Sequence, residues 1–206
     1  MSKIFLTSSG LSNKKVMERF VKVVGGNLGE VAIITTASEE KENNKYCKLA
    51  FKQLKEIGFD VVDFIDLEAE PNKDFSKYDV IYVSGGNTFR LLKFARKANF
   101  KKTIQELFDR GGIYVGVSAG SYIMCPTIEA STWKNGDVNV VGLKDLIALN
   151  FVPFLLSVHY EPKYLEMIKR GASNSKYAVK ILTDKQALFI QDSKVQFIGE
   201  GNVVEL

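Results

Sequence analysis

The sequence predicts an α/β protein in which helices cover both faces of a mostly parallel sheet. Segments rich in aliphatic and β-branched residues alternate along the chain with segments of helical periodicity. The strand-like segments are apolar without interruption, which is typical of parallel strands that are buried on both faces. The chain has 206 residues, 46% of them hydrophobic, so we expect a single domain of ordinary size over residues 1–206.

The first half of the chain contains four predicted strands with helices between them. Apolar residues recur at helical spacing over residues 13–24 and 46–57, and glycines follow both segments. The charged segment 38–44 is expected to be an exposed loop or the start of a helix, and 71–78 a polar connection. The predicted strands of this half are residues 3–7, 31–36, 61–65 and 80–83.

The second half begins with the same alternation and then changes character. Two helices are predicted at residues 89–98 and 103–108, followed by a strand at 113–118. The pattern weakens after Met124, and residues 125–141 are expected to be loop-like. A strand at 154–158 and a helix at 162–170 come next, and strands follow at 179–182, 187–191 and 195–198. We expect this C-terminal part to be small and antiparallel, its last two strands forming a hairpin.

Composition excludes several classes of function. The net charge of +4 is small and scattered, which argues against nucleic acid as a partner. No apolar run is long enough to span a membrane, and the N-terminus lacks a signal-peptide pattern, so a cytoplasmic protein is expected. The chain has two cysteines, Cys47 and Cys125, and a single histidine without metal-ligand spacing, so we expect neither a metal nor a cofactor. Nothing in the sequence indicates the oligomeric state.

The most informative stretch lies at the end of the strand predicted at 113–118. Gly116, Ser118 and Gly120 match G-x-S-x-G, the pattern of a sharp strand-to-helix turn that carries a nucleophilic serine. Small residues are needed two positions before and after the serine because the backbone folds back on itself. The N–H group of Ala119, at the start of the next helix, could stabilise an oxyanion. The pattern is short, and a glycine-rich turn with a capping serine fits it equally well.

A serine nucleophile needs a base and an orienting acid. His159 is the only histidine and follows a predicted strand, so it can reach the same sheet edge as the serine. Asp184 also follows a predicted strand and is the favoured acid. Asp192 lies in the predicted hairpin turn, where aspartate is common for backbone reasons. Asp137 and Glu129, in the loop after the turn, are weaker candidates.

The segment Ser84-Gly85-Gly86-Asn87-Thr88 can supply a second oxyanion donor. Two glycines at a strand end allow the backbone to approach a substrate closely, and Asn87 or Thr88 can cap the next helix. By itself this segment is equally typical of an ordinary loop between a strand and a helix.

These segments together resemble the dipeptidase E / cyanophycinase family of serine peptidases, peptidase family S51. The resemblance extends to Cys125-Pro126-Thr127-Ile128 and Asp184-Lys185-Gln186-Ala187-Leu188 and covers most of the chain. It implies a flavodoxin-like three-layer sandwich related to class I glutamine amidotransferases, with serine replacing their cysteine. It also implies that a short peptide is hydrolysed through an acyl-enzyme.

The resemblance also implies the roles of individual residues. Ser118 is the nucleophile, His159 the base, and Asp184 the acid at a position where the family often has glutamate. The N–H groups of Gly86 and Ala119 form the oxyanion hole. The neighbours Gly85 and Asn87 are expected to bind substrate.

Three departures from the family pattern affect these expectations. Asp184 is one methylene shorter than glutamate. Trp133 stands near the position of an alternative acid, with Asp137 the nearest substitute. The basic segment that reads an aspartate side chain in dipeptidase E has no counterpart after His159, and neither Lys169 nor Arg170 aligns with it, so aspartate specificity is not carried over.

Two other functions remain open from the residues alone. A serine esterase of the α/β-hydrolase type would use a similar turn, but that fold places its acid before its histidine in the chain. A non-catalytic module with an amidotransferase-like sheet would need neither Ser118 nor His159.

Overall fold

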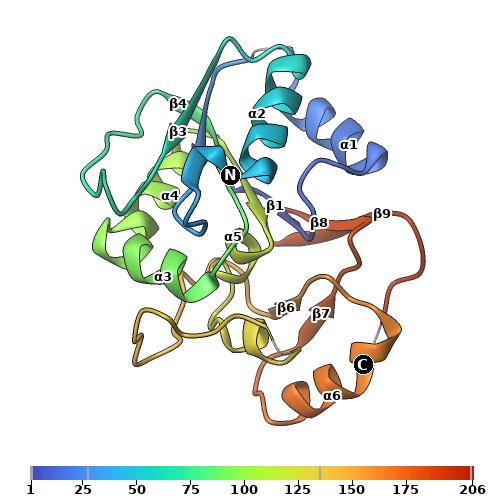
Figure 1. Ribbon diagram of the computed structural model, residues 1–206. Helices are drawn as coiled ribbons and strands as arrows, with labels where there is room; N and C mark the ends of the chain where they lie inside the picture. Colours follow the sequence, from blue (N-terminus) through green and yellow to red (C-terminus); the bar gives the residue numbers. More distant parts are fainter. Residues whose placement is uncertain (1, 27, 135, 205) are drawn as a thin grey trace.

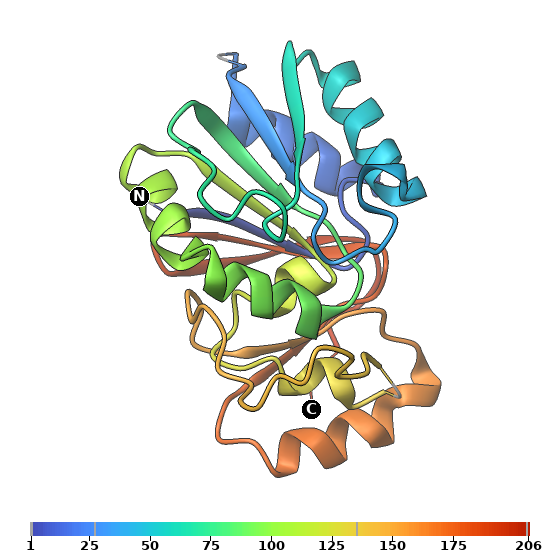
Figure 2. The same cartoon turned by 60° about the vertical axis from the view of Figure 1, so that its left-hand side comes forward.

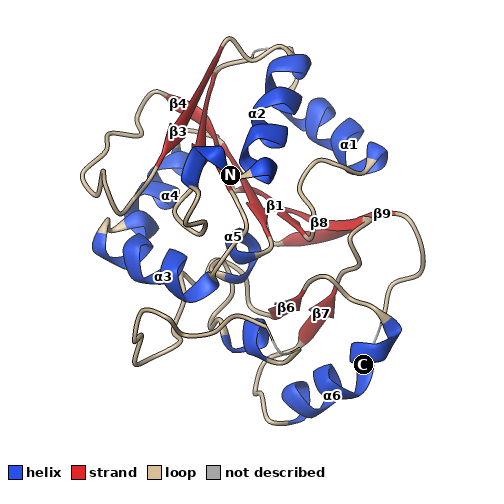
Figure 3. Cartoon of the chain, in the orientation of Figure 1, coloured by secondary structure: helices blue, strands red, loops and turns tan. Residues whose placement is uncertain are grey.

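A seven-stranded sheet forms the centre of the molecule. The computed structural model describes residues 2–26, 28–134, 136–204 and 206. Within them the strand order of this sheet is β3-β2-β4-β5-β1-β8-β9, parallel from β3 to β1 and antiparallel at β8 and β9 (Figures 1 and 3). The strands are β1 (Lys3–Thr7), β2 (Glu30–Ile34), β3 (Val61–Ile65), β4 (Tyr78–Val83), β5 (Ile113–Val117), β8 (Gln186–Gln191) and β9 (Lys194–Gly199).

Helices cover both faces of this sheet, which makes the predicted three-layer α/β sandwich. Figure 1 shows α1 and α2 on one side of the strands and α3, α4 and α5 on the other. The side chains of β1 divide between two cores: Phe5 packs with Phe20 and Leu54 from α1 and α2, and Leu6 packs with residues of α3 and α4. The helices are α1 (Lys14–Val24), α2 (Lys45–Ile57), α3 (Thr88–Lys97), α4 (Phe100–Asp109), α5 (Ala119–Tyr122) and α6 (Leu165–Ser173), with 3₁₀ turns η1 (Lys41–Asn43), η2 (Glu129–Thr132) and η3 (Pro162–Tyr164).

Caps at the helix ends follow from the residues that stand there. Asn13, Asn44 and Asn87 each accept backbone N–H groups at the start of α1, α2 and α3, as asparagine at an N-cap commonly does. Gly58 ends α2 with φ of 114°, a conformation that other residues rarely adopt. The predicted helix cap at Asn87 is therefore confirmed, and the predicted helix at 103–108 is longer, covering α4.

The expectation that the C-terminal strands are antiparallel is right for one pair and wrong for another. β8 and β9 form the predicted hairpin, and Asp192 and Ser193 occupy its turn with positive φ. Strands β6 (Leu155–Ser157) and β7 (Val179–Ile181), however, pair in parallel in a separate two-stranded sheet. Figure 2 shows this pair with α6, its crossover helix, below the central sheet. The intervening helix permits the parallel pairing, because parallel neighbours need a long crossover.

The helix after the glycine-rich turn is very short. α5 is a single turn of four residues, so it contributes little of a helix dipole, although its first N–H groups are free of helical partners. No helix in the described part of the chain is long and apolar enough to cross a membrane.

Candidate active site

Ser118 stands at the tip of a sharp turn between β5 and α5. Its backbone has φ of 50° and ψ of −107°, and its N–H donates to Thr7 O at 3.0 Å. A Cβ on Gly116 would lie 2.6 Å from Gly120 O, and a Cβ on Gly120 would overlap Val83 O. The two glycines of the G-x-S-x-G pattern are thus required by close backbone contacts, and the predicted turn is confirmed.

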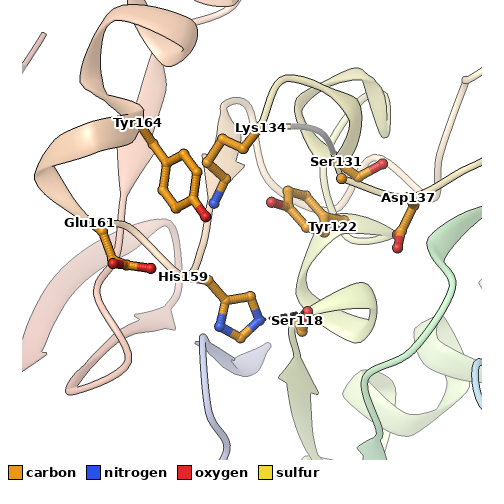
Figure 4. A pocket seen from close by; sticks show the side chains of 9 residues that line it. Ser118, Tyr122, Ser131, Lys134, Asp137, His159, Glu161 and Tyr164 are labelled. Atoms are coloured by element: carbon orange, nitrogen blue, oxygen red, sulfur yellow. Dashed lines mark hydrogen bonds between the residues drawn. The ribbon is translucent and has the colours of Figure 1, made fainter.

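The structure brings Ser118, His159 and Asp184 into one hydrogen-bonded row. His159 follows β6 by two residues and has φ of 54°. Its Nε2 lies 2.9 Å from Ser118 Oγ, the contact drawn as a dashed line in Figure 4. Its Nδ1 lies 2.6 Å from Oδ1 of Asp184, which comes from the turn between β7 and β8. The shorter aspartate side chain therefore reaches the imidazole.

These distances determine which ring nitrogen of His159 carries the proton. A carboxylate accepts but does not donate, so Nδ1 at 2.6 Å from Asp184 must be the N–H nitrogen. Nε2 then keeps a lone pair that faces the hydroxyl of Ser118. The arrangement can take a proton from the serine oxygen, as a general base requires.

Ser8 completes this cluster and is not a residue that sequence reasoning found. It is fully buried just past β1. Its Oγ donates to Asp184 Oδ1 at 2.5 Å, accepts the backbone N–H of His159 at 2.9 Å, and lies 3.1 Å from His159 Nδ1. A serine within a polar turn carries no signal in the sequence that distinguishes it from any other turn residue.

Hydrogen bonds set the charge of Asp184. The donation from His159, followed by that from Ser8, holds the pKa of this carboxyl well below its ordinary value despite partial burial. Asp184 is therefore ionised at neutral pH, and an imidazolium formed at His159 would face a negative charge.

The glycines after β4 lie beside Ser118. A Cβ on Gly85 would lie 3.1 Å from Ser118 Cβ, and a Cβ on Gly86 would overlap the backbone at Ala37. Gly86 also has φ of 141°, which favours glycine. Asn87 uses its side-chain oxygen to cap α3 and its nitrogen to contact Val138 O at 2.8 Å. The oxygen and the nitrogen of the Asn87 side-chain amide are thus both hydrogen-bonded within the protein.

A cavity of about 200 Å³ opens above Ser118 and His159 and is lined by ionisable side chains (Figure 4). Lys134 projects into it, donates to Val158 O, and places its ammonium group 5.5 Å from the ring centre of Tyr164. Burial lowers the pKa of Lys134 to about 8. Lys134 is a second residue that sequence reasoning missed, because a loop side chain shows no pattern that reveals where it points.

A second cavity of about 410 Å³ also reaches Ser118. Gly85, Gly86, Ser8 and Asp184 line it, together with Tyr46 and Leu49 of α2, which are 64% and 43% exposed. Ser118 and His159 are common to both cavities, and the other lining residues differ, so a substrate bound at the serine could extend into either cavity.

The other candidate acids have different partners. Asp137 lines the smaller cavity and accepts the N–H of Thr88 at 2.7 Å. Glu129 accepts from Ser175 at 2.7 Å, and Asp192 lies in the hairpin turn.

Trp133, Lys169 and Arg170 lie in or beside α6. Trp133 packs its ring against Gly171 of α6, where a Cβ would overlap the indole. Lys169 pairs with Glu166 along the same helix at 3.0 Å. Neither Lys169 nor Arg170 is among the described residues that line the two cavities beside Ser118.

The fold and the site together define a class. A serine on a sharp turn, an imidazole and a carboxylate stand in a hydrogen-bonded row beside the carboxyl end of a parallel strand in an α/β sandwich. The model of peptidase family S51 matches residues 4–198 of the chain. The chain therefore belongs to peptidase family S51, which places it among the peptidases.

Individual relatives agree with this assignment. An uncharacterized peptidase of Listeria monocytogenes is 30% identical over 203 residues, covering 95% of this chain and 97% of its own. Peptidase E of Salmonella paratyphi A is 28% identical over 163 residues, 78% of this chain and 69% of its own.

Solved structures show the same fold. The crystal structure of a protein assigned as a peptidase E from Listeria monocytogenes matches with a TM-score of 0.79 and 30% identity, covering 98% of this chain and all of that one. A peptidase from an acI-B1 actinobacterium matches with a TM-score of 0.68 at 15% identity, and this likeness concerns the fold alone.

Proposed function

We propose that the protein is a serine peptidase that hydrolyses short peptides through an acyl-enzyme on Ser118. The observation that carries the proposal is the row of contacts from Ser118 Oγ to His159 Nε2 at 2.9 Å and from His159 Nδ1 to Asp184 Oδ1 at 2.6 Å. It provides a nucleophile, a base and an orienting carboxylate in the mutual geometry that acyl transfer requires.

In the first step the oxygen of Ser118 attacks the carbonyl carbon of the substrate. Nε2 of His159 takes the serine proton and then delivers it to the nitrogen of the leaving amine as the peptide bond breaks. In the second step water gives a proton to the same nitrogen and attacks the acyl-enzyme. The ester bond to Ser118 breaks, and His159 returns the proton to the serine oxygen. Asp184 stays ionised and stabilises the imidazolium in both steps.

The negative charge that develops on the carbonyl oxygen is stabilised by the backbone N–H groups of Gly86 and Ala119. Two features support this role. Ala119 is the first residue of α5, so its N–H has no partner within the helix. Gly85 and Gly86 line the cavity that contains Ser118, and the backbone of Gly85 lies against that residue. Fixed donors of this kind commonly provide the largest share of acyl-transfer catalysis.

The substrate is a short peptide and the protein a cytoplasmic, single-domain exopeptidase. The limited size of the smaller cavity, about 200 Å³, supports a pocket for one residue, and its ionisable lining suits a charged group. Family membership and the peptidase E relatives support the peptide as substrate class.

A screen of a dipeptide library, with released amino acids as the readout, tests the proposal. Simple carboxylic esters form the comparison set at the same enzyme concentration. We expect a subset of dipeptides to be cleaved. Cleavage of esters without cleavage of any dipeptide would favour an esterase, and no cleavage of either would favour a non-catalytic module.

A further inference from the structure

The residues at the end of β1 hold all three members of the proposed catalytic row. Thr7 O accepts the N–H of Ser118 at 3.0 Å. The adjacent Ser8 contacts His159 twice and Asp184 once through a single oxygen. Ser118, His159 and Asp184 each lie more than one hundred residues from β1 in the sequence, yet all three are held by Thr7 or Ser8.

Accounting for protons gives Ser8 a defined orientation. A serine hydroxyl has one proton to donate and two lone pairs. The Ser8 hydroxyl donates its hydrogen bond to Oδ1 of Asp184 at 2.5 Å. One of its lone pairs accepts the backbone N–H of His159 at 2.9 Å. Ser8 is fully buried, so its hydroxyl is satisfied by these groups of the protein.

Each of these hydrogen bonds restrains a different element of the site. The bond from the His159 N–H holds a backbone with φ of 54°, which a non-glycine residue adopts only when its surroundings impose it. The bond to Oδ1 fixes the carboxylate oxygen that also receives Nδ1–H. The side chain of Asp184 is 62% exposed, so packing alone restrains it little and its hydrogen bonds set its orientation.

From this geometry we infer that Ser8 is a positioning residue, which holds the His159 backbone and the Asp184 carboxylate in register so that Nε2 faces Ser118. The inference rests on the proposed function and adds to it a residue outside the catalytic row. Ser8 itself touches no reacting atom and acts through His159 and Asp184.

The experiment compares Ser8→Ala with the parent on the best dipeptide from the screen. Loss of a hydrogen bond to an ionised group predicts a fall in kcat of about 10- to 100-fold, with KM within about twofold. Thr36→Val is the matched control, because Thr36 is also a fully buried hydroxyl after a strand that accepts one backbone N–H, from Leu67 at 2.8 Å. It should lower stability without this loss of kcat.

A double-mutant cycle separates positioning from general structural damage. In an Asp184→Ala background, Ser8→Ala should lower kcat by a smaller factor than in the parent, because one of the two groups through which Ser8 acts is already gone and only its bond to the His159 backbone remains. An equal loss in both backgrounds, or an unchanged kcat in Ser8→Ala, would overturn the inference.

Two further variants keep the test decisive. If Ser8→Ala does not fold, Ser8→Cys replaces it, since a thiol fills the space with a weaker donor, and the same fall in kcat is expected. Ser8→Thr retains the hydroxyl and should stay within about tenfold of the parent, whereas a loss as large as that of Ser8→Cys would count against the inference. Ser118→Ala is measured in parallel. If Ser118→Ala stays active, the proposed function itself fails. If Ser118→Ala is inactive but Ser8→Ala is fully active, the proposed function stands and only the role of Ser8 is refuted.

Discussion

Ser118 and His159 both have positive φ, 50° and 54°, and their side chains meet at 2.9 Å. Such backbones cost on the order of 1–3 kcal/mol each in a non-glycine residue and persist only where the surroundings hold them. Here the holding contacts come from Thr7 O and Ser8 Oγ, at the end of β1. The strain therefore lies in the two residues that share the proposed proton transfer.

The backbone strain predicts an unusual order of stability at the nucleophile. Replacing Ser118 by glycine should give a protein more stable than replacing it by alanine, by about 1 kcal/mol, because glycine adopts positive φ without a steric cost. The free energies of unfolding in urea measure the difference. At most strand and helix positions the alanine variant is more stable than the glycine variant. If the alanine variant were also the more stable one at Ser118, the backbone there would not be strained.

A substitution of the proposed acid tests its role. Asp184→Asn keeps the shape of the side chain but lets an amide face Nδ1, and the ring can then adopt the wrong tautomer. We expect kcat for a cleaved dipeptide to fall on the order of 10³- to 10⁴-fold. The matched control is Asp192→Asn in the hairpin turn, where asparagine tolerates the positive φ of 49°. A similar loss in both variants would show that the effect is not specific to Asp184.

The lowered pKa of Asp184 also predicts how stability depends on pH. A carboxyl whose pKa is lower in the folded state contributes stability above its unfolded pKa, about 3.9, and loses it as the pH falls through the folded value. The stability difference between the parent and Asp184→Asn should therefore shrink as the pH falls below about 4. Urea unfolding at pH 3 and at pH 4 measures it, and a difference that grows from pH 4 to pH 3 would contradict the assigned shift.

Much of this site could be predicted from sequence because the relevant residues stand at strand ends. Gly116, Ser118 and Gly120 form a local pattern with a steric cause, and His159 has no competitor of its kind. Asp184 was separable from Asp192 because one follows a predicted strand and the other lies in a turn. Patterns of this type involve residues close together in the sequence, so they can be recognised without the structure.

The remaining features depend on contacts between distant segments. Ser8 acquires its position only when β1 lies next to the loops that carry His159 and Asp184. Lys134 reaches its cavity from a long loop with no periodic signal. The parallel pairing of β6 with β7 was missed because short apolar segments do not reveal their partner or direction.

The partly buried Lys134 predicts a charge preference that changes with pH. Its ammonium group projects into the smaller cavity, so Lys134→Met should lower kcat/KM for dipeptides with an acidic first residue about tenfold relative to neutral ones. Because its pKa is about 8, the parent should lose the same preference as the pH rises from 7 to 9. Lys144→Met removes an exposed lysine and serves as control. A preference that survives both changes would rule out Lys134 as its source.

The kinetics of Ser118→Ala on the best dipeptide test the central claim most directly. The substitution removes the attacking oxygen and leaves both cavities, so kcat should fall by about 10⁴-fold or more while the protein stays folded by circular dichroism. Hydrolysis by the folded Ser118→Ala protein within about tenfold of the parent rate would contradict an acyl-enzyme at this serine.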